Sequence, residues 1–219
     1  MTAAPLVEAR ALAVARDGRA VLREVDLALA DGERVFIDGP IGAGKSTLLL
    51  ALIGLLPRQA GSVRLFGQPC DGESDFAPLR GPVGLLFQDP DDQLLGPTVL
   101  EDVEFGPLNR GADAQQAHRA AEAALQHVAC GHLLSRPVHA LSGGEKRLVA
   151  LAGLLAMQPR VLLLDEPTAA LDADAARRVT DALAATGLPM IVASHDAACA
   201  ARLATRRLTL ADGRLQSLA

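Results

Sequence analysis

The N-terminal part of the chain alternates short apolar segments with turn residues. This pattern predicts strands over Leu6–Val14, Val21–Leu29 and Arg34–Asp38. Asp17-Gly18 and Asp31-Gly32 lie between these strands, and Asp-Gly pairs readily adopt the positive φ angles of tight turns. We therefore expect the chain to begin with a unit rich in β-structure.

Helical and strand-like segments alternate beyond this unit. A helix is expected from Ser46 to about Leu56, because Pro57 would end it. Further helices are predicted over Ala112–Val128, Ser142–Met157, Ala173–Ala185 and Asp196–Leu203. Further strands are predicted over Val63–Phe66, Val83–Phe87, Val161–Asp165 and Pro189–Ser194, with a closing hairpin over Leu208–Leu215. The alternation is typical of an α/β fold, and no repeat or linker divides the chain into parts.

The segment from Gln88 to Pro107 follows neither the helical nor the strand period. Pro, Asp and Gly residues fill it, so we expect an irregular segment with a functional role. It opens a helical insertion that we expect at about residues 89–157. The whole chain, residues 1–219, is expected to form a single domain.

Composition narrows the class of protein. Half of the residues are hydrophobic, which excludes disorder as the main state, yet no apolar run reaches the roughly 20 residues that span a bilayer. A net charge of −5 argues against binding along a nucleic-acid backbone. The N-terminus has no secretory signal pattern. Three widely spaced cysteines form neither a disulfide framework nor a zinc pattern, which indicates a reduced, cytosolic protein.

A glycine-rich turn lies between a predicted strand and a predicted helix. Its residues fit the pattern GxxxxGK[ST]: Gly39, Pro40, Ile41, Gly42, Ala43, Gly44, Lys45 and Ser46. The glycines let the backbone curl so that its N–H groups converge on phosphate oxygens, and the helix N-terminus adds its dipole. Lys45 should reach the β- and γ-phosphates, the Ser46 hydroxyl should coordinate Mg²⁺, and Thr47 can support the α-phosphate. A chance glycine-rich turn is the alternative, which the flanking strand and helix disfavour.

Two carboxylates end the predicted strand Val161–Asp165. Ligand sites of parallel sheets lie at the carboxyl ends of the strands. Asp165 would hold Mg²⁺ directly or through its water, and Glu166 would orient or deprotonate an attacking water. Alone, such a pair is common before a helix in any α/β protein. With a phosphate loop upstream, it is strong evidence for a nucleotide site.

One further segment, residues 141–145, resembles the LSGGQ signature of ABC-type ATPases, with Glu145 in the last place. The other motifs keep the order of that family: GPIGAGKST (39–47), Phe87-Gln88, LLLDEP (162–167), AALD (169–172) and ASHD (193–196). The resemblance covers nearly the whole chain. It implies a P-loop NTPase (RecA-like) core with an N-terminal antiparallel β subdomain and an inserted helical signature subdomain.

The resemblance also implies how ATP is held. Two copies would dimerise head to tail around two ATP molecules. Each ATP would lie between the phosphate loop of one copy and the signature of the other, where Ser142, Gly143 and Gly144 open a helix. An ordinary Ser-capped helix start is the alternative for Ser142 taken alone. Asp172 would cross the dimer interface and help to set the opposite site.

Two more residues gain a role from the same resemblance. Gln88 would sense the γ-phosphate through Mg²⁺ and water. His195 would hydrogen-bond the γ-phosphate and hold the water and Glu166 in place. The chain departs from the family near Arg16, where an aromatic residue usually stacks on adenine. Arg16 either stacks through its guanidinium plane or stays solvated, with weak recognition of the base.

Three segments narrow the family resemblance to importers of the energy-coupling-factor type: residues 87–94, 97–99 and 101–107. Those importers take up cobalt, nickel or vitamins such as biotin. The resemblance implies an integral membrane coupling subunit, a substrate-binding membrane component, and a homodimer or a heterodimer with a second ABC ATPase at the cytoplasmic face of the inner membrane. The turn Asp91-Asp92-Gln93 would transmit closure, unless it is simply a solvated turn. The alternatives are a subunit of another ABC transporter and a soluble ABC ATPase without a transport role.

Overall fold

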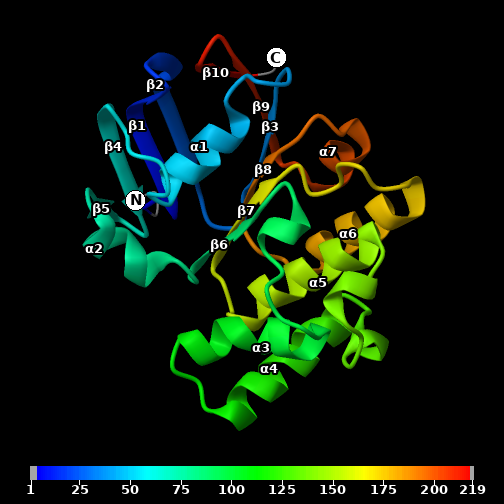
Figure 1. Cartoon of the computed structure of the whole chain (residues 1–219). Coiled ribbons are helices and arrows are strands. Elements are labelled where there is room, and N and C mark those ends of the chain that lie inside the picture. Colours follow the sequence, from blue (N-terminus) through cyan, green and yellow to red (C-terminus); the bar gives the residue numbers. More distant parts are fainter. Residues whose placement is uncertain (1–3, 218–219) are drawn as a thin grey trace.

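Two β-sheets and a group of helices make up the structure (Figure 1). The computed structural model describes residues 4–217. One sheet has four strands in the order β2-β1-β4-β5, and the other has six in the order β10-β9-β3-β8-β7-β6. Figure 1 shows the four-stranded sheet at one end of the molecule and helices α3 and α4 at the other. The predicted α/β class is confirmed.

The four-stranded sheet is antiparallel throughout. Its strands are β1 (Val7–Arg16), β2 (Arg19–Leu29), β4 (Ala60–Leu65) and β5 (Gln68–Cys70). Asp17 and Gly18 form the tight turn between β1 and β2, with φ angles of 49° and 74°. This sheet is the N-terminal antiparallel β subdomain that the family resemblance implied. The short strand β5 was not predicted.

The six-stranded sheet is parallel except at one edge. Its strands are β3 (Arg34–Asp38), β6 (Val83–Leu86), β7 (Val161–Asp165), β8 (Met190–Ala193), β9 (Arg206–Ala211) and β10 (Arg214–Ser217). Only β10 pairs antiparallel, with β9, through the predicted Asp212-Gly213 turn. β3 follows β2 along the chain but pairs with β8 and β9, so the two sheets are joined directly.

Each face of the parallel sheet packs against a separate hydrophobic cluster. Along β7, Val161 and Leu163 join the cluster shared with the antiparallel sheet and α1 (Lys45–Leu52), while Leu162 and Leu164 join the cluster shared with the other helices. Burial on both faces explains why β7 is apolar at every one of these positions. The strand thereby holds its terminal carboxylates on a rigid support.

The remaining helices follow the predicted order with two additions. They are α2 (Glu73–Phe76), α3 (Val99–Asn109), α4 (Ala114–His127), α5 (Gly143–Ala156), α6 (Ala173–Ala185) and α7 (Ala197–Leu203). Short 3₁₀ turns lie at Ala77–Leu79, Pro90–Asp92, Gly131–Leu133 and Val138–Ala140. Within residues 4–217, no helix has the length and apolar character needed to cross a bilayer. Helix α1 ends at Leu52, earlier than predicted, and Gly54 next to it has a φ of 71° and packs against the Phe76 ring.

Helix α3 corrects the expectation of an irregular segment from Gln88 to Pro107. Val99 and Val103 bury one face of the helix, and the Thr98 side chain caps its start. The N–H groups of Val99 and Leu100 donate to the carbonyl oxygens of Arg136 and Leu134. These long-range partners satisfy the helix start, and the packed face outweighs the cost of Pro107 inside the helix.

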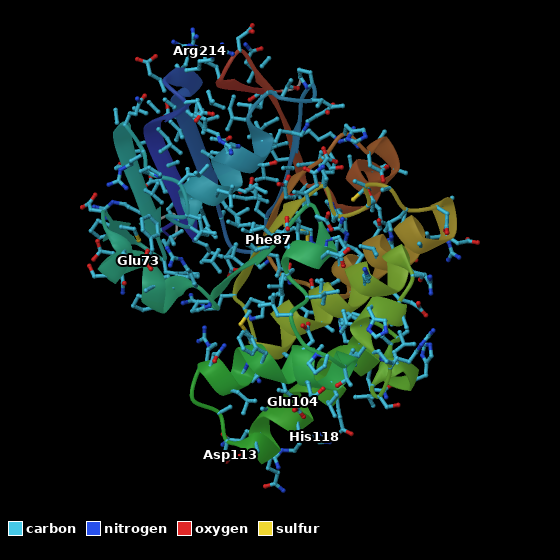
Figure 2. All side chains as sticks on the ribbon, viewed as in Figure 1. Glu73, Phe87, Glu104, Asp113, His118 and Arg214 are labelled. Atoms are coloured by element: carbon cyan, nitrogen blue, oxygen red, sulfur yellow. The ribbon has the colours of Figure 1, made fainter. Side chains whose placement is uncertain are left out.

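Helices α3, α4 and α5 pack together as the insertion between β6 and β7. On the outer side of this unit, Figure 2 labels Glu104 of α3 and His118 of α4. The Nδ1 atom of His118 lies 2.8 Å from Oε1 of Glu104. Because both side chains are partly exposed, this contact adds little to stability. Buried apolar residues of all three helices belong to one hydrophobic cluster, which holds the unit together.

Candidate functional site

The phosphate loop runs from the end of β3 to the start of α1. Gly39, Gly42 and Gly44 have φ angles of 151°, 82° and 102°, which residues with a Cβ rarely adopt. A Cβ at Gly39 would lie 2.4 Å from the carbonyl oxygen of Leu210. Lys45 begins the helix, and its Nζ donates to the carbonyl oxygen of Gly39 at 2.7 Å. The loop thus curls around its own lysine beside the helix N-terminus.

A cleft of about 360 Å³ brings together most of the candidate residues. They come from the end of β1, the phosphate loop and the ends of β6, β7 and β8. The lining includes Arg16, the loop residues 40–47, Gln88, Asp165, Glu166 and His195. Ser142, Gly143, Gly144 and Asp172 do not line it and lie at the starts of α5 and α6. A single chain therefore assembles one half of the expected ATP site.

Glu166 directly follows β7 and accepts hydrogen bonds from the end of β8. The Ser194 hydroxyl donates to its Oε2 at 2.8 Å, and Nδ1 of His195 lies 3.0 Å from the same oxygen. Lys45 Nζ is 3.5 Å from Oε1. Burial raises the pKa of Glu166, but the hydrogen bonds from His195 and Ser194 outweigh burial, and the pKa lies below its ordinary value. The carboxylate is therefore ionised and held in one orientation at neutral pH.

Asp165, the last residue of β7, has an incompletely hydrogen-bonded carboxylate. The carboxylate is buried, and its Oδ1 has no hydrogen-bond partner among the residues that the structure describes. Burial raises the pKa of Asp165, while a hydrogen bond from the Ser46 side chain opposes that shift. A buried carboxylate oxygen beside a hydroxyl is an oxygen donor set of the kind that Mg²⁺ uses. The residues present therefore fit the expected cation.

Arg147 of α5 is a residue of this region that the sequence analysis missed. It is 2% exposed, and its guanidinium donates to the carbonyl oxygens of Phe87, at 2.6 Å, and of Gln88. Figure 2 labels Phe87 beside the end of β6, where the parallel sheet meets the helices. Burial lowers the pKa of Arg147, and the charge of Asp89 opposes this. The signal in the sequence was an arginine directly before the apolar run that begins at Leu148.

Two further contacts attach the segment after Gln88 to α5. Gln93 donates from Nε2 to the carbonyl oxygen of Ala150 at 2.9 Å and accepts from the Phe87 N–H at 3.3 Å. Lys146 Nζ lies 2.6 Å from Oδ1 of Asp91. The turn 91–93 is thus bonded to the helix that starts at the signature, rather than only solvated.

The signature segment forms a capping box at the start of α5. The Ser142 hydroxyl accepts from the Glu145 N–H at 3.3 Å, and the Glu145 carboxylate accepts from the Ser142 N–H at 2.7 Å. This backbone hydrogen bond lowers the pKa of Glu145. Glutamate can therefore fill the last place of the signature, because it makes the capping bond itself. Asp172 plays a similar part on α6, where Oδ1 accepts from the Ala175 N–H at 2.8 Å.

Arg16 lies at the exposed end of β1 and lines the cleft. Within residues 4–217, its side chain makes no hydrogen bond or ion pair with the protein. Nearby in the phosphate loop, Ile41 is 96% exposed. The geometry leaves the guanidinium free either to meet a base or to stay in water.

Comparisons with known proteins show the family of this chain. A family model described as ABC transporter matches residues 22–169. The cobalt import ATP-binding protein CbiO of Rhodobacter capsulatus is 46% identical over 217 residues, covering 96% of this chain and 77% of that protein. The energy-coupling factor transporter ATP-binding protein EcfA of Methanothermobacter thermautotrophicus is 42% identical over 203 residues, covering 91% of this chain and 65% of that protein.

Solved structures of ABC ATPases have a similar fold. The structure of cbiO1 from Clostridium perfringens, described as part of the ABC transporter complex cbiONQ, has a TM-score of 0.88 and 32% identity, covering 97% of this chain and 87% of that one. The cassette MJ0796, solved as a dimer in a post-hydrolysis state with ADP and Pi, has a TM-score of 0.85 and 27% identity. That comparison covers 97% of this chain and 99% of the other.

Proposed function

Because the chain belongs to the ABC transporter family and is an ATPase subunit of that family, we propose that it energises an importer of the energy-coupling-factor type. The solute would be cobalt, nickel or a vitamin such as biotin. The similarity to CbiO and EcfA supports this subclass, as does the FQDPDDQL segment at 87–94. The proposal includes a single nucleotide-binding domain over residues 1–219, with α3–α5 as the inserted helical part.

The observation that carries the proposal is an exposed apolar surface beside the Gln88 segment. We call it the α3 surface: Leu95, Phe105 and Leu108, which are 72%, 53% and 44% exposed. Phe105 and Leu108 are three residues apart and share one face of α3. The Leu95 N–H donates to the Asp102 carboxylate, so Leu95 is held beside the helix that carries Phe105 and Leu108. Grouped exposed apolar side chains indicate a protein partner.

The position of the α3 surface suggests what the partner does. In the same helical unit, Arg147 donates to the carbonyl oxygens of Phe87 and Gln88, and Gln93 joins the Phe87 N–H to Ala150 of α5. A segment of an integral membrane coupling subunit that docks on Leu95 and Phe105 would therefore move with the residue that senses the γ-phosphate. A substrate-binding membrane component would choose the solute. The ATPase would act at the cytoplasmic face of the membrane, as a homodimer or with a second ABC ATPase.

The proposed ATP site is a sandwich of two copies. The phosphate loop of one copy binds the phosphates through its N–H groups and Lys45, and Ser142 of the opposite copy closes over the γ-phosphate. When bound at Ser46, Gln88 and Asp165, Mg²⁺ supplies positive charge to the β- and γ-phosphates. The similarity to MJ0796, solved as a dimer with ADP and Pi, supports the sandwich.

Hydrolysis in this site is an in-line attack of water on the γ-phosphorus. The new P–O bond forms as the bond to the β–γ bridging oxygen breaks, which releases ADP and phosphate. Glu166 orients the water and accepts its proton, and Ser194 and His195 hold the carboxylate in place. Positioning and charge neutralisation should carry most of the rate.

The proposal is tested by purifying the tagged chain from gently solubilised membranes of its source and identifying what co-purifies by mass spectrometry. A multi-span coupling protein and a small substrate-binding membrane protein are expected, and the second would identify the solute. Phe105→Asp should reduce the recovery of both by about tenfold or more, because a charge is buried in an apolar contact. Leu55→Asp is the control, since Leu55 is another exposed apolar side chain, at 44%, but follows α1.

Other outcomes would favour the alternatives. Recovery of only ribosomal, DNA-bound or other soluble partners would overturn the transport role and leave the ATPase mechanism. Recovery of a membrane protein without a small substrate-binding component would favour another type of ABC transporter.

A further inference from the structure

Helices α5 and α6 are in tight contact at Gly144 and Ala175. A Cβ added at Gly144 would lie 2.8 Å from the Cβ of Ala175, a separation that real Cβ atoms essentially never show. Both positions are buried. Gly144 is helical and is not among the glycines with a positive φ. The backbone angle therefore does not require glycine at this position, whereas the contact with α6 does.

Ala175 has a second role in the same place. Its N–H donates to Oδ1 of Asp172 at 2.8 Å, and the Ala176 N–H donates to the Asp172 carbonyl oxygen at 2.9 Å. Ala175 thus fixes the carboxylate of Asp172 while its methyl group touches α5. On the other helix, Gly144 lies two residues after Ser142, the N-cap of α5. The contact between Gly144 and Ala175 therefore connects the signature segment to Asp172.

From this geometry we infer that Ala175 is a positioning residue, which sets the spacing between the signature segment and Asp172 by packing against Gly144. The inference rests on the proposed ATP sandwich, in which both segments act on the nucleotide bound by the other copy. Neither Gly144 nor Ala175 has a side-chain torsion that could relieve an overlap. Any added atom must displace one helix start relative to the other, and the two segments can then no longer fit the opposite copy together.

A different explanation of Gly144 makes a different prediction. If glycine is needed only so that the backbone can approach a phosphate, a Cβ at position 144 weakens the ATP-dependent dimer whichever residue occupies position 175. If the contact with α6 is the reason, removing the Ala175 methyl group restores the space. The double variant Gly144→Ala with Ala175→Gly separates these explanations.

The experiment measures the ATP-dependent dimer of the full chain by analytical ultracentrifugation. All variants carry Glu166→Gln, so that ATP is not consumed. Gly144→Ala should weaken the dimer by about tenfold or more, because overpacking in a rigid contact costs that much. Adding Ala175→Gly should bring the dimer dissociation constant back to within about threefold of Ala175→Gly alone. Binding of a fluorescent ATP analogue to the monomer should stay unchanged in all variants.

Gly153→Ala is the matched control. Gly153 lies on the same helix, but nothing lies within 4 Å of a Cβ added there. It should leave dimerisation unchanged and improve thermal stability, as alanine usually does within a helix. The melting temperature of each nucleotide-free variant is measured as well. If Ala175→Gly restores the melting temperature that Gly144→Ala lowers, the contact between the two residues is verified.

The outcomes separate this inference from the proposed function. Normal dimerisation of Gly144→Ala, or a double variant as weak as Gly144→Ala, would overturn the positioning role while the sandwich stands. A parent that stays monomeric with ATP would overturn the sandwich of two copies, and this inference with it, and would favour pairing with a second ABC ATPase. Rescue of dimerisation by Ala175→Gly would support the inference.

Discussion

The guanidinium of Arg147, buried on α5, donates a hydrogen bond to the carbonyl oxygen of Phe87 over 2.6 Å. A second N–H of the same group donates to the carbonyl oxygen of Gln88. Its Nε has no hydrogen-bond partner in the part of the chain that the structure describes. The orientation of Arg147 therefore depends on these two carbonyl groups, and one side chain links the helix of the signature to the residue expected to sense the γ-phosphate.

Replacing Arg147 with methionine should lower both thermal stability and ATPase activity. The apolar stem is largely kept, but two carbonyl groups lose their donors, at a cost of about 1–3 kcal/mol for each that stays buried and unpaired. Thermal unfolding and the ATPase rate measure the two effects. Lys146→Ala is the control, because it removes only a partly exposed ion pair worth less than about 1 kcal/mol. Equal ATPase rates in the two variants would contradict the link to Gln88.

Glu166→Gln should retain ATP binding and lose turnover. The amide keeps the shape of the side chain but cannot accept a proton from water, and loss of such assistance typically costs about 10²–10⁴-fold in rate. Single-turnover hydrolysis and the dissociation constant for ATP measure the two properties. Unchanged hydrolysis in this variant would refute the role of Glu166.

Glu166 should also stabilise the nucleotide-free fold in a pH-dependent way. The pKa of Glu166 is lowered in the folded state: burial raises it, and the hydrogen bonds from His195 and Ser194 more than offset that. The resulting stability is present above the ordinary pKa of 4.5 and is lost as the pH falls through the lower folded-state pKa. Melting temperatures across this acidic range, compared between the parent and Glu166→Gln, would reveal the effect. A parallel fall in both proteins would argue against it.

Asp165 should give the folding stability the opposite pH dependence. Burial raises the pKa of Asp165, so the folded state holds the proton more tightly than the unfolded chain. Its contribution to stability is present below the ordinary pKa of 3.8 and is lost as the pH rises through the raised value. At neutral pH, Asp165→Asn should therefore melt at a higher temperature than the parent without nucleotide, while Mg²⁺ no longer enhances its binding of ATP. A lower melting temperature would contradict the argument.

Arg16→Ala should change the dissociation constant for ATP by less than about threefold, because no hydrogen bond or ion pair within residues 4–217 orders the exposed guanidinium. Arg16→Tyr should tighten ATP binding, since stacking on a base is worth about 1–3 kcal/mol. Titration with a fluorescent ATP analogue measures both. A large loss with alanine would instead mean that the guanidinium stacks on the base.

Much of the fold could be read directly from local patterns. The Asp17-Gly18 and Asp212-Gly213 turns, the buried strand β7 and the phosphate loop all lie where the sequence placed them, because each depends on neighbouring residues. Helix α3 could not be read in this way. Its first N–H groups are satisfied by carbonyl groups of residues 134 and 136, and its buried face needs α4 and α5.

In the candidate site, too, some features follow from local sequence and others from tertiary packing. The sequence by itself predicted which groups would meet the phosphates, because the phosphate loop and the residues that follow β7 and β8 are short motifs whose local geometry follows from glycine and from parallel strands. Tertiary structure alone decided how those groups are held. The bonds from Arg147 to Phe87 and Gln88, and the contact between Gly144 and Ala175, join residues on different elements. Their distances depend on how whole helices pack, and local sequence does not encode that packing.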